Sequence, residues 1–103
     1  MTNRLDQLDH IAIQVKNIKK SLNWYLSNFD CKEIYSDDTW AFIEFNNVKL
    51  ALVTKLEHPP HFAIIDNTIN MELKSIVKHR DGSISKYIKD IDGNYIELLK
   101  YND

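Results

Sequence analysis

The chain has little of several residue types that mark special classes of protein. It contains two glycines, two prolines and a single cysteine, Cys31, so no internal disulfide can form and we expect a structural thiol there. No apolar run is long enough to cross a membrane, and no secretory leader is recognisable. We therefore expect a cytoplasmic protein that is stabilised neither by disulfides nor by a bilayer.

The balance of charge excludes a further class. The 13 Lys and Arg against 15 Asp and Glu leave a net charge of -2, and no basic run is interleaved with aromatic residues. A generic nucleic-acid surface is therefore not expected, and Lys16, Lys19 and Lys20 are interpreted as the solvated side of a helix. With 103 residues, of which 44% are hydrophobic, residues 1–103 are predicted to form one soluble domain without nucleic-acid or membrane partners.

Two stretches of the sequence repeat one another, and each carries a histidine. Residues 9–13 (DHIAI) return as residues 60–64 (PHFAI). Both stretches alternate with the period of a β-strand, so His10 and His61 hold the same place on equivalent strands.

A second echo adds a carboxylate. Residues 49–52 (KLAL) correspond to residues 95–98 (YIEL), and Glu97 falls on the opposite strand face from Ile96 and Leu98. Two imidazoles and one carboxylate at corresponding strand positions suit a borderline divalent ion. The sequence therefore predicts a metal site, against the alternative of a buried polar cluster satisfied by hydrogen bonds.

The first half is predicted to run β-α-β-β-β. Asn17 is a good helix cap, and the apolar residues that follow it have the spacing of an amphipathic helix. Trp24 is assigned to core packing in the apolar stripe of this helix. The Asn46-Asn47 pair indicates a hairpin. The predicted strands span residues 8–15, 31–35, 40–45 and 48–53, and the stripe consists of Ile18, Leu22, Tyr25 and Phe29, widened by Trp24 and Leu26.

Residues 54–60 contain both prolines and are predicted to connect the halves. Further strands are expected around residues 61–65, 83–89 and 94–101. We favour a helix in the segment that follows, because four apolar residues have helical spacing there: Ile69, Leu73, Ile76 and Val77. With this helix, the second half has one strand fewer than the first. The alternative is a strand over residues 71–80, paired through an Asp81-Gly82 hairpin.

Both ends of the sequence resemble the vicinal oxygen chelate superfamily of glyoxalases, bleomycin-resistance proteins, fosfomycin-resistance enzymes and extradiol dioxygenases. Residues 8–15 (LDHIAIQV) and the following helix with Trp24-Tyr25 look like its opening strand and helix, and residues 87–98 (YIKDIDGNYIEL) are similar to its closing signature, with Ile91 where a proline is usual. The resemblance implies an α+β fold of two tandem βαβββ modules that form a curved mixed sheet around a cleft, the second module shortened. The modules would span about residues 8–53 and 61–101, with residues 54–60 as connector.

The same resemblance implies that His10, His61 and Glu97 ligate a divalent ion such as Fe, Mn, Ni, Zn or Co. The family's fourth ligand position falls on Ala51, or on Leu50 if the register slips by one, and neither side chain binds a metal. The remaining set of two histidines and a carboxylate is the one shared with the extradiol dioxygenases and the fosfomycin-resistance enzymes. The resemblance also implies a homodimer whose sites take His10 from one chain and His61 and Glu97 from the other.

Further residues are candidates for catalysis and for substrate binding. Besides Glu97, Tyr87 and Glu44 are candidate catalytic groups, although packing of Tyr87 and solvation of Glu44 are the simpler interpretations. Trp40 and Phe42 are predicted to form an apolar wall for a substrate, or else to pack in the core or in a dimer.

Three functions remain open at this point. The first is a metal-dependent dioxygenase, lyase or transferase acting on a small oxygenated metabolite that chelates the ion. The second is a metal-free, dimeric ligand-binding module similar to the bleomycin-resistance proteins, and the third is an interaction role. The intact ligand set favours the first function. The other two histidines, His58 in the connector and His79 in a charged segment, are interpreted as surface residues.

Overall fold

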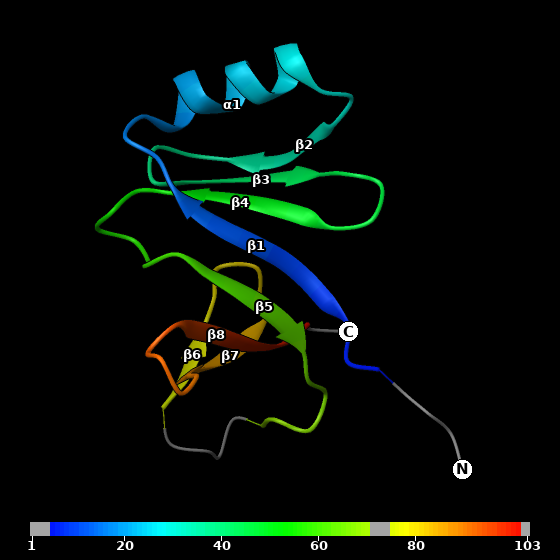
Figure 1. The fold of residues 1–103 in the computed structure, drawn as a ribbon, viewed down its shortest axis with the longest axis vertical. Helices are drawn as coiled ribbons and strands as arrows, with labels where there is room; N and C mark the ends of the chain where they lie inside the picture. Colours follow the sequence, from blue (N-terminus) through cyan, green and yellow to red (C-terminus); the bar gives the residue numbers. More distant parts are fainter. Residues whose placement is uncertain (1–4, 71–74, 102–103) are drawn as a thin grey trace. The chain divides into compact units, whose positions relative to one another are not determined.

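The computed structural model describes residues 5–70 and 75–101 of the chain. By its internal contacts the chain divides into a first unit, His10–His61, and a second unit, Met1–Asp9 together with Phe62–Asp103. Figure 1 shows the helix and the strands of the two units. Within these described residues, no helix combines the length and the apolar character that crossing a bilayer requires.

The first unit has the predicted order β-α-β-β-β. It consists of β1 (Leu8–Gln14, of which residues 10–14 belong to this unit), α1 (Ile18–Asn28), β2 (Lys32–Ser36), β3 (Trp40–Glu44) and β4 (Lys49–Val53). The strands lie in the order β2-β3-β4-β1, with β1 parallel to β4 and the other pairs antiparallel. The α+β class and the mixed sheet predicted from the sequence are therefore confirmed.

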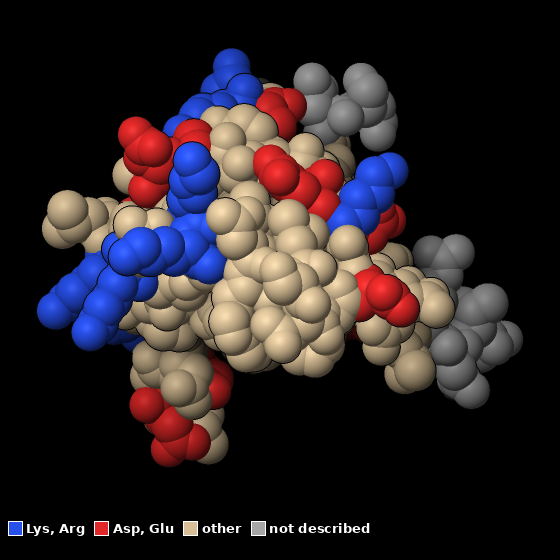
Figure 2. Space-filling model, turned by 90° about the horizontal axis from the view of Figure 1, so that it is seen from above, with Lys and Arg blue, Asp and Glu red and all other residues tan. Residues whose placement is uncertain are grey.

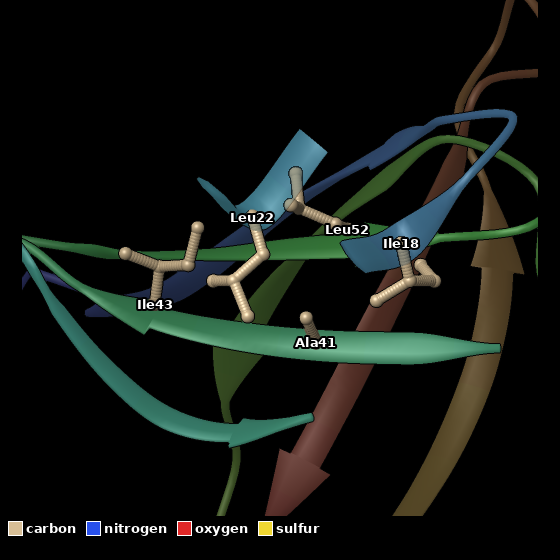
Figure 3. Packing of buried hydrophobic residues seen from close by; sticks show 5 residues of the cluster. All are labelled: Ile18, Leu22, Ala41, Ile43 and Leu52. Carbon is tan, nitrogen blue, oxygen red and sulfur yellow. The ribbon is translucent and has the colours of Figure 1, made fainter. Parts of the chain in front are cut away.

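The helix α1 covers one face of this sheet. Asn17 caps it, because the Asn17 Oδ1 accepts a hydrogen bond of 2.9 Å from the Lys20 backbone N–H. Apolar residues of α1 pack on alternate residues of β3 and β4, as Figure 3 shows. The buried members of this helix-side core are Ile18, Leu22, Ala41, Ile43 and Leu52, and Cys31 packs against them as the expected structural thiol.

Two residues of the predicted helix stripe do not belong to the core: Phe29, which follows the end of α1 and is 50% exposed, and Trp24. Trp24 was assigned to core packing, but 55% of its surface is exposed, and its ring lies edge-on to those of Tyr25 and Phe29. Trp24 follows the buried Leu22 by two residues, about 200° around a helix of 3.6 residues per turn, so its side chain lies on the outer side of α1. Lys16, Lys19 and Lys20 are exposed as predicted, but Lys16 lies before the start of α1. Figure 2, viewed from the α1 side, shows basic side chains gathered beside an uncharged surface.

The second unit repeats the strand order of the first. Its strands are β5 (His61–Ile65, of which residues 62–65 belong to this unit), β6 (Ile76–Lys78), β7 (Ile84–Lys89) and β8 (Tyr95–Lys100), in the order β5-β8-β7-β6. Each strand corresponds to the one four places earlier in the chain, since the first unit reads β1-β4-β3-β2 in the same direction. The internal repeat seen in the sequence is therefore present in the fold.

The helix favoured for this half is wrong where the structure describes it. Ile76 and Val77 lie in β6, which pairs antiparallel with β7, so the alternative of a strand paired through the Asp81-Gly82 hairpin is correct over residues 76–78. Leu73 and the start of the proposed strand lie outside the described residues. The Asp81-Gly82 turn decides the outcome, because Gly82 adopts a φ of 88° and its N–H donates to the His79 carbonyl. The expectation of a missing strand is wrong as well, because all four strands are present.

Candidate functional site

The two histidines predicted as ligands lie side by side in the first unit. His10 is on β1 and His61 begins β5, and each is 8% exposed. Their ring centroids are 5.8 Å apart, with the ring planes at 74°. A zinc–nitrogen bond is about 2.1 Å long, and a ring nitrogen lies about 1 Å from its ring centroid. A centroid separation of 5.8 Å is therefore short enough for both rings to bind one ion. The pair forms within a single chain and needs no partner chain.

A backbone hydrogen bond fixes the tautomer of His61. Its Nδ1 lies 2.8 Å from the carbonyl oxygen of Pro59, which only accepts hydrogen bonds, so Nδ1 carries the proton. The lone pair of the neutral ring is then on Nε2. Donation of the second ring N–H to a backbone carbonyl is the usual arrangement of a metal-binding histidine.

A row of aromatic side chains leads to His10 along β3 and its neighbours. The ring of Phe42 lies 5.2 Å from that of His10, and Trp40 lies 5.6 Å from Phe42. Tyr35 extends the row at 4.7 Å from Trp40, and Lys49 Nζ lies 5.2 Å from the centre of the Phe42 ring. The structure thus brings the predicted substrate wall to His10.

The position predicted for a fourth ligand offers no donor. Ala51 is 2% exposed and pairs with Ala12 and Phe42 on the sheet face that carries His10. Leu50 lies on the opposite face, where it packs against the helix-side core. The register is therefore the predicted one, with Ala51 and not Leu50 on the sheet face that carries His10.

Glu97 lies on β8 and is 3% exposed. The hydroxyl of Ser85 donates a short hydrogen bond to Glu97 Oε2. His79 Nε2 lies 2.7 Å from Ser85 Oγ and 3.3 Å from the same carboxylate oxygen. A carboxylate buried this deeply is retained only with such partners.

Two histidines that were interpreted as surface residues instead lie beside predicted site residues. His79 is in contact with Glu97, and the ring of His58 lies 5.8 Å from that of His61. Both are partly buried. The hairpin register of the Asp81-Gly82 turn was the signal for His79, because it places this residue across from Ser83, two residues before Ser85.

The two other candidate catalytic residues lie in different surroundings. Tyr87 on β7 is the direct partner of Glu97 on β8, so the two side chains share a sheet face, and Tyr87 is partly buried. Glu44 is exposed and pairs with Lys32 and Lys49 on the neighbouring strands. The position of Glu44 suits a solvated strand residue, whereas Tyr87 is next to a predicted ligand.

A second buried carboxylate precedes His10. Asp9 is 6% exposed, and its Oδ2 accepts a hydrogen bond of 2.6 Å from the hydroxyl of Tyr101. Burial, followed by this hydrogen bond and the charge of Asp9, raises the pKa of Tyr101 far above its ordinary value of 10.0. The phenol therefore stays protonated and keeps donating to Asp9 in alkaline solution.

We expect Tyr101→Phe to lower the free energy of unfolding by about 1.5 kcal/mol or more at pH 8, because it removes a hydrogen bond to a charged group. Above about pH 10 the unfolded chain releases the phenol proton and the folded chain keeps it, so the wild type loses stability as pH rises. The difference between wild type and variant should therefore shrink from pH 8 to pH 11 in urea unfolding. Tyr95→Phe on β8 is the control, with an expected change within about 0.5 kcal/mol; a difference for Tyr101→Phe that does not change with pH would contradict the assignment.

No family model and no curated protein matches the chain. Solved structures do match. A variant of methylmalonyl-CoA epimerase from Streptomyces coelicolor, in complex with 2-nitronate-propionyl-CoA, has a TM-score of 0.78 at 14% identity, covering 97% of this chain and 100% of that chain. The methylmalonyl-CoA epimerase of Mycobacterium tuberculosis has a TM-score of 0.75 at 14% identity, covering 100% and 93%.

A hypothetical protein from Bacillus halodurans C-125 is also similar, with a TM-score of 0.75 at 21% identity and 97% of both chains covered. At these identities the likeness concerns the course of the backbone. The chain therefore has the fold of the methylmalonyl-CoA epimerases.

Proposed function

We propose that the chain is a divalent-metal-dependent enzyme of the vicinal oxygen chelate superfamily. The proposed ligands are His10, His61 and Glu97, and the proposed substrate is a small oxygenated metabolite that binds the ion through two neighbouring oxygens. The fold shared with the epimerases supports this membership, as do the sequence signatures at both ends of the chain.

The observation that carries the proposal is the state of the two histidines. His61 is held in the tautomer that leaves Nε2 as the donor atom, and the ring of His10 is 5.8 Å away. Both histidines are only 8% exposed, so the two imidazoles meet largely out of contact with water. Neutral nitrogen donors of this kind suit Zn, Fe, Ni, Co and, with a carboxylate, Mn.

Glu97 fits the third position by its chemistry. Its carboxylate is buried and oriented by the Ser85 hydroxyl, as ligating carboxylates commonly are. A metal with three protein ligands acts as a Lewis acid on a bound oxygen and keeps positions open for the substrate. Tyr87, which shares a sheet face with Glu97, is the proposed residue for holding or moving a proton, and Trp40 and Phe42 are the proposed wall against the apolar part of the substrate.

The proposal includes a homodimer, with both histidines of a site taken from the same chain. His10 and His61 meet within one copy, so a site divided between the histidines of two chains is not proposed.

The row of aromatic rings from Tyr35 to His10, above the small side chains of Ala12 and Ala51, favours a second candidate function. That function is the metal-free binding of an apolar ligand, as in the bleomycin-resistance proteins that the sequence resembles.

The test that separates the two functions is metal binding by the wild-type protein. The chain is purified without chelator or metal-affinity tag, and its metal content is measured by elemental analysis. The apo-protein is then titrated calorimetrically with Mn²⁺, Co²⁺, Ni²⁺ and Zn²⁺. We expect about one ion per chain from at least one of these metals. No uptake of any ion would overturn the enzyme proposal in favour of the metal-free module.

A further inference from the structure

Two side chains of the second unit, those of Ser85 and His79, converge on one carboxylate oxygen of Glu97. Ser85 on β7 and His79, which follows β6, both lie against Oε2 of Glu97 on β8. Ser85 is fully buried, and the side chain of His79 is 23% exposed. We refer to Ser85 and His79 as the carboxylate clamp.

The directions of the two hydrogen bonds follow from the number of protons. A serine hydroxyl carries one proton, and Ser85 donates it to the Glu97 carboxylate. Towards His79 the Ser85 oxygen can therefore only accept, so the proton of that 2.7 Å contact belongs to His79 Nε2. The two hydrogen bonds therefore run in one direction: His79 donates to Ser85, and Ser85 donates to Glu97.

We propose that Ser85 and His79 are positioning residues that make Glu97 bind its metal ion through Oε1 alone. This inference rests on the metal site proposed above. Hydrogen bonds to Oε2 reduce the charge that this oxygen offers to a cation and fix the rotation of the carboxylate. A two-oxygen mode, which would fill one more coordination position, is thereby disfavoured.

The single-oxygen mode has a consequence for the substrate. Two imidazoles and one carboxylate oxygen occupy three positions of the ion and leave the others for a bidentate ligand. Ala51 stands at the position of the family's fourth ligand on the sheet of the first unit, and its side chain offers no donor atom. The clamp thus keeps open the positions that a substrate with two neighbouring oxygens requires.

Packing alone does not explain a serine at position 85. A hydroxyl at a fully buried strand position must find a partner to offset its desolvation, and an alanine there would avoid that cost. Ser83 provides the comparison, because it is 3% exposed and its hydroxyl also donates to a carboxylate, that of Asp81, at 2.6 Å. The Ser83 bond closes a turn, whereas the Ser85 bond is directed at the proposed ligand.

The experiment compares Ser85→Ala with Ser83→Ala as a matched control. Both variants lose one buried hydroxyl that is bonded to a carboxylate, so both should melt at a lower temperature than the wild type. Only Ser85→Ala should weaken Co²⁺ binding, by about 10- to 100-fold in calorimetry, which is the usual effect of losing a residue that orients a ligand. It alone should also change the visible absorption of bound Co²⁺, because a second carboxylate oxygen then enters the coordination sphere.

Variants at the two clamp positions complete the test. His79→Gln retains an N–H donor and should bind Co²⁺ with nearly the wild-type spectrum, whereas His79→Ala should shift the spectrum in the direction of Ser85→Ala. Ser85→Thr keeps the hydroxyl and should restore the spectrum if it folds.

The outcomes separate the two proposals. Wild-type affinity and spectrum in folded Ser85→Ala and His79→Ala would overturn the clamp while leaving the metal site in place. Failure of the wild type to bind Co²⁺ or any of the other three ions would overturn the metal site and the clamp with it.

Discussion

Replacing His61 by asparagine is expected to abolish most metal binding while the fold survives. The asparagine amide can take over the hydrogen bond from Nδ1 to the Pro59 carbonyl, but it has no atom in place of Nε2. The affinity for a divalent ion should fall by more than about 100-fold, since loss of a residue that merely orients a ligand already costs 10- to 100-fold. Calorimetry on apo-protein with Zn²⁺ and Co²⁺ measures the change, and circular dichroism checks the fold.

The chain offers a matched control for this variant. The ring of His58 lies 5.8 Å from that of His61, as the ring of His10 does, but His58 is outside the proposed ligand set. His58→Ala should therefore retain metal binding within a few-fold, whereas His10→Ala and Glu97→Ala should lose it as His61→Asn does. A folded His61→Asn protein that binds as the wild type does, or a His58→Ala protein that loses the metal, would show that the ligand set is wrong.

The first half of the chain was predictable because its local signals agree with one another. Asn17 caps a helix whose stripe includes Ile18 and Leu22, and both side chains are buried where the stripe places them. The Asn46-Asn47 pair joins β3 to β4 as predicted, closed by a hydrogen bond from the Phe45 N–H to the Val48 carbonyl. Where cap, period and turn chemistry point to the same structure, sequence alone suffices.

The second half was misjudged because two signals conflict there. Ile69, Leu73, Ile76 and Val77 have helical spacing, but the described part of this segment contains a strand only three residues long. So short a strand carries no recognisable alternation, and a tertiary partner, β7, decides its conformation. The Asp81-Gly82 turn was the more reliable signal, since it fixes a hairpin by backbone geometry.

The ligand candidates were recognisable from the repeat, but their neighbours were not. His79 and Ser85 are six residues apart and approach Glu97 only through the register of β6, β7 and β8. His58 belongs to a proline-containing connector without periodicity, so nothing in the sequence directs its ring towards His61. Residues that contact a candidate ligand without being ligands themselves are identified from the strand register, because no sequence motif marks them.

The largest expected effect on stability comes from Leu52→Ala. Leu52 is fully buried on β4, and it packs with Ile18 and Leu22 of α1 (Figure 3). Removing three buried carbons from such a site costs about 3 kcal/mol, through lost transfer free energy and the cavity that remains. For a chain of this size that is a large share of the total stability and should lower Tm by more than about 10 °C.

Leu56 provides the control for this substitution within the same unit. It is 98% exposed, so Leu56→Ala removes the same atoms without leaving a cavity and should change the free energy of unfolding by less than about 0.5 kcal/mol. Urea unfolding of both variants, followed by circular dichroism, measures the two values. Equal values would mean that α1 does not cover this face of the sheet. The predicted difference would instead show that the core beneath α1 holds together the sheet on which His10 and Ala51 lie, on the face opposite the helix.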